Sequence, residues 1–136
     1  MNFSNVLSRC ILVILAGVFS TAAIADESAS GEVAGKCGAS PQQPSIPNGM
    51  KASMDDMLAA QRNIKAYQAD SQKYRACIDE LMAEWEGQSK NADDDAKKVI
   101  AQKKDIAVAF YNRSVSDEED VANMFNTAIH AFKGRK

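Results

Sequence analysis

The fold is decided by residues 53–86, which read SMDDMLAAQRNIKAYQADSQKYRACIDELMAEWE. No proline or glycine interrupts this stretch, and apolar or small residues recur in it at alternating intervals of three and four. They are Met57, Ala60, Ile64, Tyr67, Ser71, Tyr74, Ile78, Leu81 and Trp85. Such spacing places them along one side of an α-helix, as in a coiled-coil seam. With Ser53 as its N-cap, the predicted helix runs from Ser53 to Glu86 and ends near Gly87.

A second long helix is predicted over Ala96–Phe132, with its N-cap at Asp93 or Asp94. Its apolar stripe comprises Ile100, Ala107, Tyr111, Ser114, Val121, Phe125, Ala128 and Phe132. Charged residues occupy two further positions of this stripe, Lys104 and Glu118. We therefore expect the middle of the helix to pack less tightly than its ends.

The stretch around Ser116 could interrupt the second helix. Ser116 is followed three residues later by Glu119, which is the pattern of a capping box. A kink or a restart of the helix at this point remains open.

Two long amphipathic helices joined by a short loop bury both stripes most directly as an antiparallel hairpin. The predicted fold is therefore all-α, a coiled-coil-like two-helix hairpin over residues 53–136. A hairpin of two helices has a thin core, and a chain this small needs further stabilisation.

The first 25 residues have the layout of a secretory signal peptide. A polar start with Arg9 precedes an apolar run from Cys10 to Phe19, and Ala23-Ile24-Ala25 matches an A-x-A cleavage site. We expect cleavage after Ala25 and a periplasmic or secreted location. The apolar run is shorter than the ~20 residues of a membrane-spanning helix, so no stable membrane insertion is expected after cleavage.

Removal of the signal peptide would leave Cys37 and Cys77 as the only cysteines. An even count in an oxidising compartment predicts one intramolecular disulfide, with an intermolecular bridge or free thiols as alternatives. Ser53 lies 16 positions after Cys37, and as polyproline II this stretch would span ~50 Å. Because Cys77 lies ~36 Å along the helix from Ser53, the bridge is within reach.

Residues 26–52 are rich in glycine, serine and proline and contain few large apolar side chains. Pro41, Pro44 and Pro47 recur at the three-residue period of polyproline II. We expect an extended arm that turns at Asn48-Gly49 and docks along the first helix of the hairpin. Alanines at positions 59, 66 and 69 would allow such a chain to approach closely.

The sequence contains little that indicates catalysis. It lacks a Cys-x-x-Cys pair, a nucleophile elbow and a glycine-rich phosphate loop, and its one histidine has no clustered metal-ligating partners. The 15 basic and 18 acidic residues after Ala25 give a net charge of −3, which does not favour nucleic acid as a partner. We therefore expect no enzymatic activity and no cofactor.

A pattern across Cys37–Lys133 resembles a group of small exported proteobacterial proteins without an assigned function. It reads C…P…P…IPNG…M…M…AQ…IKAYQ…Y…CI, followed by YN…FN…A…FK. The resemblance implies a periplasmic helical protein and supplies no catalytic residues. The layout is also similar to small periplasmic coiled-coil chaperones, whose strongly basic client-facing surface this chain does not match.

The expected function is that of a non-enzymatic binding or structural protein, which contacts another envelope protein or a second copy of itself. Tyr67, Tyr74 and Trp85 are candidate contact residues, although a place in the core is the simpler interpretation of each. One alternative is a thiol/disulfide-responsive envelope protein switched at Cys37–Cys77. A weaker alternative is an enzyme without a recognisable motif.

Overall fold

A computed structural model describes residues 21–135 of the 136-residue chain, with side chains described from Glu27 onward. It contains three helices, α1 (Thr21–Cys37), α2 (Met54–Ser89) and α3 (Asp94–Gly134), and no strand within the described range. The prediction of an all-α protein is therefore confirmed. Of the predicted signal peptide, residues 1–20 lie outside the described part, and the predicted cleavage site falls within α1.

Helix α2 begins as predicted, because Ser53 and Asp56 form a capping box. The Asp56 amide donates to Ser53 Oγ at 3.1 Å, and the Ser53 amide donates to Asp56 Oδ2 at 2.8 Å. All nine residues of the predicted stripe are buried. The predicted end at Gly87 is wrong, since α2 continues to Ser89. A glycine inside a helix costs only about 1 kcal/mol, which is not enough to stop a helix of this length.

Helix α3 begins at its predicted cap, where Asp93 accepts a hydrogen bond from the Ala96 amide at 2.8 Å. It then runs without a break through Ser116, so the possible kink does not occur. Four of the eight stripe residues, Ala107, Ser114, Val121 and Ala128, are buried, and the other four are half-buried.

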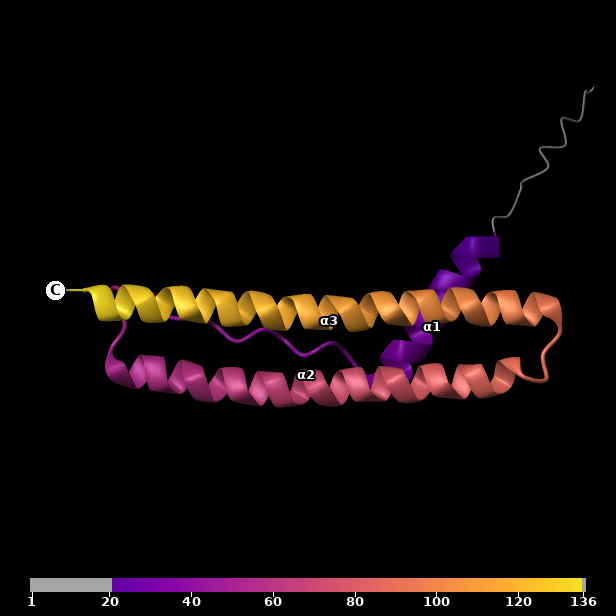
Figure 1. The fold of residues 1–136 in the computed structure, drawn as a ribbon, viewed down its shortest axis with the longest axis horizontal. Helices are drawn as coiled ribbons and strands as arrows, with labels where there is room; N and C mark the ends of the chain where they lie inside the picture. Colours follow the sequence, from indigo (N-terminus) through magenta and orange to yellow (C-terminus); the bar gives the residue numbers. More distant parts are fainter. Residues whose placement is uncertain (1–20, 136) are drawn as a thin grey trace, which may run out of the picture.

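Helices α2 and α3 lie alongside each other in opposite directions and are joined by the short loop at residues 90–93 (Figure 1). The two charged positions of the α3 stripe are paired across the helices. Lys104 forms an ion pair with Glu86, and Glu118 forms one with Arg75 at 2.8 Å. Both charged positions of the α3 stripe therefore have a partner on α2, Glu118 in the middle of the helix pair and Lys104 near the loop.

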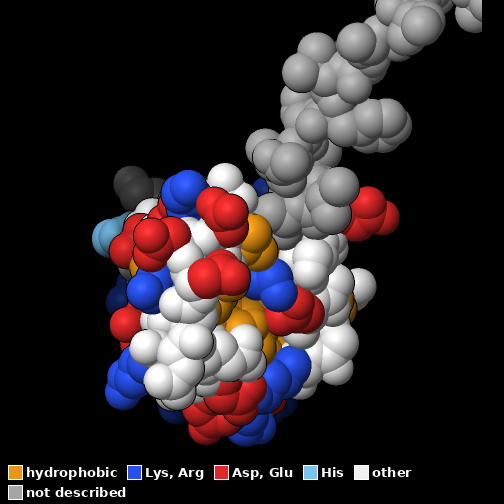
Figure 2. All heavy atoms as spheres, turned by 90° about the vertical axis from the view of Figure 1, so that its right-hand side faces the viewer, with side chains coloured by type: hydrophobic (Ala, Val, Ile, Leu, Met, Phe, Trp, Pro, Cys, Tyr) orange, Lys and Arg blue, Asp and Glu red, His pale blue; other side chains and the backbone are white. Residues whose placement is uncertain are grey.

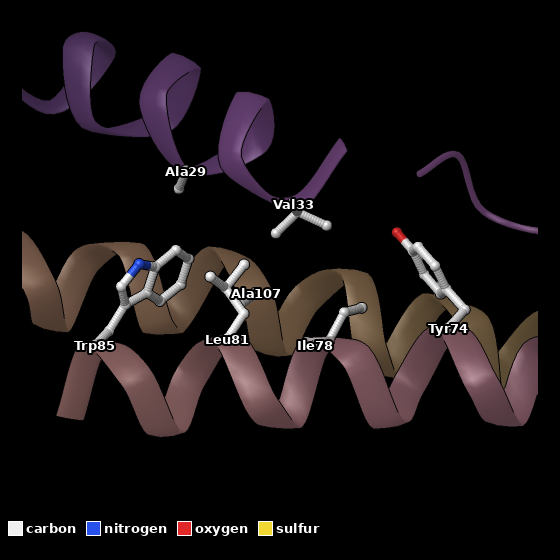
Figure 3. Packing of buried hydrophobic residues seen from close by; sticks show 7 residues of the cluster. All are labelled: Ala29, Val33, Tyr74, Ile78, Leu81, Trp85 and Ala107. Atoms are coloured by element: carbon white, nitrogen blue, oxygen red, sulfur yellow. The ribbon is translucent and has the colours of Figure 1, made fainter. Parts of the chain in front are cut away.

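Helix α1 corrects the prediction of an extended arm over residues 26–52, which is wrong for residues 26–37. Ala29 and Val33 lie one turn apart on α1, and both are almost completely buried against α2 and α3 (Figure 3). Gly31 and Gly35 face open space on the other side. These tertiary contacts offset the weak helix propensity of the segment, which composition alone could not reveal.

Gly38 ends α1 in a left-handed conformation with φ of 75°, and its amide donates to the Ala34 carbonyl at 3.0 Å. From Gly38 to Ala52 the chain forms no regular helix, and it runs back toward the start of α2 (Figure 1). Ile46 packs against two clusters of buried residues between α2 and α3. This Pro-rich segment, residues 38–52, thus covers the part of the helix pair that α1 does not reach.

The predicted turn at Asn48-Gly49 is present. Asn48 Oδ1 accepts from the Met50 amide at 3.0 Å, and the Asn48 carbonyl accepts from the Ala52 amide at 2.8 Å. Gly49 is buried, and a Cβ at this position would lie 2.0 Å from the Ala128 carbonyl oxygen. Only glycine therefore fits where the turn meets α3.

Candidate protein-contact surface

The three aromatic residues proposed as contacts are all in the core. Tyr67, Tyr74 and Trp85 are 6%, 6% and 2% exposed. Figure 3 shows Trp85 and Tyr74 on the side of α2 that faces α1 and the core. Burial also raises the pKa of both tyrosines. None of the three presents a surface to a partner, so a contact site has to lie elsewhere.

The disulfide Cys37–Cys77 is present, as predicted, with 5.6 Å between the Cα atoms. It joins the last residue of α1 to the middle of α2, and both cysteines are half-exposed. One residue before the bridge, Lys36 forms an ion pair with Glu84 of α2. The bridge and the ion pair together fix the end of α1 on one flank of the helix pair.

Glu32 forms a polar cluster that holds the middle of α1. Its Oε2 accepts a hydrogen bond from Trp85 Nε1 at 2.9 Å, and its Oε1 is paired with Lys103 of α3. The Lys103 ammonium lies 5.6 Å from the centre of the Trp85 ring. The hydrogen bond from Lys103 holds the pKa of the Glu32 carboxyl below its usual value. One carboxylate therefore ties α1 to both long helices.

The flank of the helix pair away from α1 and the Pro-rich segment is uncovered within the described residues. On α2, Asn63, Cys77 and Glu84 occupy the covered flank, beside Pro47, Cys37 and Lys36 respectively. The other flank carries three shallow hollows in a row along α2 and α3. We call this flank the open face. Its main lining residues are Met54, Leu58, Gln61, Gln68, Arg75, Glu86 and Ser89 on α2 and Lys97, Ala101, Lys104, Val115, Glu118, Ala122, Phe125, Ile129 and Phe132 on α3.

The apolar end of the open face is a groove of ≈ 320 Å³ near the start of α2 and the end of α3. Its most exposed apolar residues are Met54 and Leu58, at 58% and 44%. Phe125 and Phe132 form much of the opposite wall. Methionine and leucine side chains on such a surface can adapt to the shape of a partner. Exposed apolar grooves of this kind mark protein-contact or ligand-binding sites.

The middle of the open face is built around Arg75. Its guanidinium pairs with Glu118, donates to Ser114 Oγ at 3.2 Å, and lies 6.0 Å from the centre of the Tyr111 ring. The Arg75 and Glu118 side chains are only 13% and 20% exposed. The Arg75–Glu118 pair thus joins α2 to α3 at this level, and a largely buried ion pair is weak evidence for added stability.

The loop end of the open face is charged. Figure 2 looks at this end of the molecule and shows Asp/Glu and Lys/Arg side chains mixed around a strip of hydrophobic atoms. Here Glu86 pairs with Lys104, which lowers the pKa of the Glu86 carboxyl. The open face therefore changes from apolar at the groove to mixed charge at the loop.

Sequence reasoning found Phe125 and Phe132 as part of the α3 stripe but missed most of the other apolar residues of the open face. Leu58 and Met54 lie outside the three-four spacing of the α2 seam, and Val108 and Val115 lie beside the α3 stripe. The available signal is a second row of apolar residues on α3 at seven-residue intervals. It is visible only when positions next to the main stripe are counted separately.

The described residues hold no group of three or more His, Cys, Asp or Glu side chains that could bind a metal ion. Among residues 21–135, no helix is both long and apolar enough to cross a membrane. No family model, curated protein or solved structure matches the chain.

Proposed function

We propose that this chain is an exported, non-enzymatic binding or structural protein that acts through protein–protein contacts at its open face. The observation that carries the proposal is the apolar groove between Leu58 of α2 and Phe132 of α3. Apolar side chains exposed side by side in water favour association with another surface. On the covered flank the chain's own α1 and Pro-rich segment occupy the equivalent position.

The scaffold for this contact is, in this proposal, a coiled-coil-like hairpin of α2 and α3 stapled by Cys37–Cys77. The nine buried residues of α2 follow the three-four spacing of a coiled-coil seam. Helix α1 and the Pro-rich segment add a third layer on one flank only. Such a one-sided arrangement leaves a continuous face along the pair for a partner.

Export to the periplasm is the location that fits this design. Cleavage after Ala25 would leave Ala29, Glu32 and Val33 in place, so the part of α1 that packs on the core would survive maturation. The structural disulfide also fits an oxidising compartment. The partner in that compartment would be an envelope protein or a second copy of the chain.

A pull-down from envelope extract tests the proposal with matched variants. Leu58→Glu places a charge in the groove, whereas Ala66→Glu places one on an exposed part of α2 away from the lining residues. We expect partners retained by the wild type and by Ala66→Glu to be lost from Leu58→Glu. Equal retention by all three proteins would contradict a role for the groove.

A thiol/disulfide-responsive function is a second candidate, favoured by the position of the bridge at the end of α1. Both sulfur-bearing residues are half-exposed, so a reductant can reach them. Loss of the bridge would free α1 to leave Ile78 and Trp85 uncovered. Incubation of the folded protein with millimolar thiol, followed by thiol counting, tests this idea. A bridge that stays oxidised under these conditions would exclude the switch.

A further inference from the structure

Helix α3 carries a second apolar row in addition to the one that packs against α2. Its members lie one position after Ile100, Ala107, Ser114, Val121 and Ala128 and recur every seven residues; they are Ala101, Val108, Val115, Ala122 and Ile129. Val108 is 43% exposed. Ala101, Val115, Ala122 and Ile129 line the three hollows of the open face.

A repeat of seven residues indicates what kind of surface would cover this row. Because α2 and α3 already pack as a coiled-coil-like pair, a row with this period runs straight along α3, parallel to their contact. From Ala101 to Ile129 the row extends over 28 residues, or ~42 Å at ~1.5 Å per residue. A straight stripe of this length fits a second long helix better than a loop or a compact domain.

The sizes of the side chains fit a second copy of α3 in the opposite direction. With Val115 on a two-fold axis, Val108 lies opposite Ala122 of the second copy, and Ala101 lies opposite Ile129. Each small side chain then meets a larger one, which keeps the two helices at a constant distance. A parallel arrangement would instead place Ala101 on Ala101 and Ile129 on Ile129, so the gap would vary along the row.

Helix α2 supports the same axis independently. Arg75 contacts Ser114 and Glu118, so it lies level with Val115 along the helix pair. A two-fold axis at this level places Lys65 of one copy close to Glu86 of the other. Lys65 makes no ion pair within the described residues, and the Glu86 side chain is 56% exposed. In this register the two Arg75 side chains also meet at the axis, each paired with Glu118 of its own copy, and Lys65 with Glu86 is the contact in which opposite charges meet.

We propose that the open face binds a second copy of this chain, with the two α3 helices antiparallel about a two-fold axis at Val115. This names the partner of the contact surface and rests on the function proposed above. A face two helices wide (~20 Å) and ~42 Å long corresponds to ~800 Å² per copy, which is what a stable interface buries on each partner. The two open faces together form a bundle of four long helices.

Cysteine cross-linking tests the axis. In a Cys10→Ser background with the native bridge intact, Val115→Cys lies on the axis, whereas its exposed neighbour Ser116→Cys points about 100° away. With a short thiol-specific cross-linker we expect a covalent dimer from Val115→Cys and none from Ser116→Cys. Equal yields from the two variants would overturn the proposal.

Co-expression distinguishes the antiparallel arrangement from a parallel one. Val108→Cys and Ala122→Cys should cross-link to each other when both chains are present, and neither should cross-link when expressed alone. Cross-linking of each variant alone would show a parallel pairing and would overturn the proposal.

Sedimentation velocity separates failure of the dimer from failure of the proposed function. We expect a dimer for the wild type and for Ser116→Lys and a monomer for Val115→Lys. A monomeric wild type would overturn self-association. If partners were still lost from Leu58→Glu in the pull-down, the open face would remain a contact surface for another protein.

Discussion

Gly49 lies against the main chain of Ala128, so that any side chain at position 49 would collide with α3. A Cβ there would lie 2.0 Å from the Ala128 carbonyl oxygen and 2.9 Å from the Phe132 amide nitrogen. Overpacking of this kind costs about 1–3 kcal/mol or more. We therefore expect Gly49→Ala to lower the melting temperature by several degrees, because about 1 kcal/mol corresponds to roughly 4–8 °C in a domain of this size.

Gly87→Ala provides the matched control in thermal unfolding followed by circular dichroism. Gly87 lies inside α2 with open space around its Cα. Alanine should raise stability there by about 0.5–1 kcal/mol through helix propensity. A destabilising Gly87→Ala or a neutral Gly49→Ala would contradict the packing described at these two sites.

Replacing each of the two buried serines of the helix pair by alanine should change the free energy of unfolding in opposite directions. Ser71 Oγ is buried and has no hydrogen bond of normal geometry in the described structure, only a weak polar contact with Tyr67, whereas Ser114 Oγ accepts from Arg75 at 3.2 Å. Ser71→Ala removes an unsatisfied hydroxyl and should stabilise the protein by about 1 kcal/mol. Ser114→Ala removes a partner of a charged group and should cost about 1–3 kcal/mol. Chemical denaturation of both variants measures the difference, and the same sign for both would contradict this assignment.

Loss of the disulfide should release α1 without unfolding α2 and α3. The bridge closes a loop with a sequence separation of 40 residues, which is worth about 3–4 kcal/mol in the chain-entropy model. We expect Cys37→Ser to lower the melting temperature markedly while most helical circular dichroism remains. Because α1 covers Trp85, release of α1 should expose the Trp85 ring to water and shift its fluorescence to the red. An unchanged melting temperature would show that the bridge is not a structural staple.

Acid should loosen α1 through Glu32. Its pKa is lowered in the folded protein, chiefly by the hydrogen bond from Lys103. The corresponding stability is therefore complete above the unfolded pKa of about 4.3 and is lost as the pH falls through the lower folded value. Fluorescence of Trp85, which donates to Glu32, should report the change below pH ~4. Glu32→Gln should remove this step, and a step of equal size in the variant would exclude Glu32 as its cause.

The core of the helix pair could be predicted from sequence because its signal is local. Every residue of the three-four pattern on α2 is buried, and the caps at Ser53 and Asp93 form as expected. The role of each glycine could not be predicted from sequence. Gly87 does not end α2, whereas Gly49 lies where no side chain fits. The burial of Tyr67, Tyr74 and Trp85 followed from the same pattern that first suggested them as contacts.

Helix α1 and the open face could not be predicted because both depend on tertiary contacts. Among the side chains of α1 that the structure describes, Ala29 and Val33 are the two buried apolar ones that pack on the core, and Glu32 adds hydrogen bonds to residues far away in sequence. No periodicity of useful length is present in that segment. Likewise, Leu58 becomes significant only after α1 and the Pro-rich segment are seen to cover the opposite flank.

Site-specific photo-cross-linking in the living cell tests the central claim most directly. A photoreactive phenylalanine analogue at Leu58 would lie in the apolar groove, and the same analogue at Ala66 would lie on exposed α2 surface away from it. We predict an adduct from position 58 and none from position 66, with the mass of the adduct identifying a second copy or another protein. The absence of any adduct at position 58, or an equal yield at both positions, would contradict a protein-contact function for the open face.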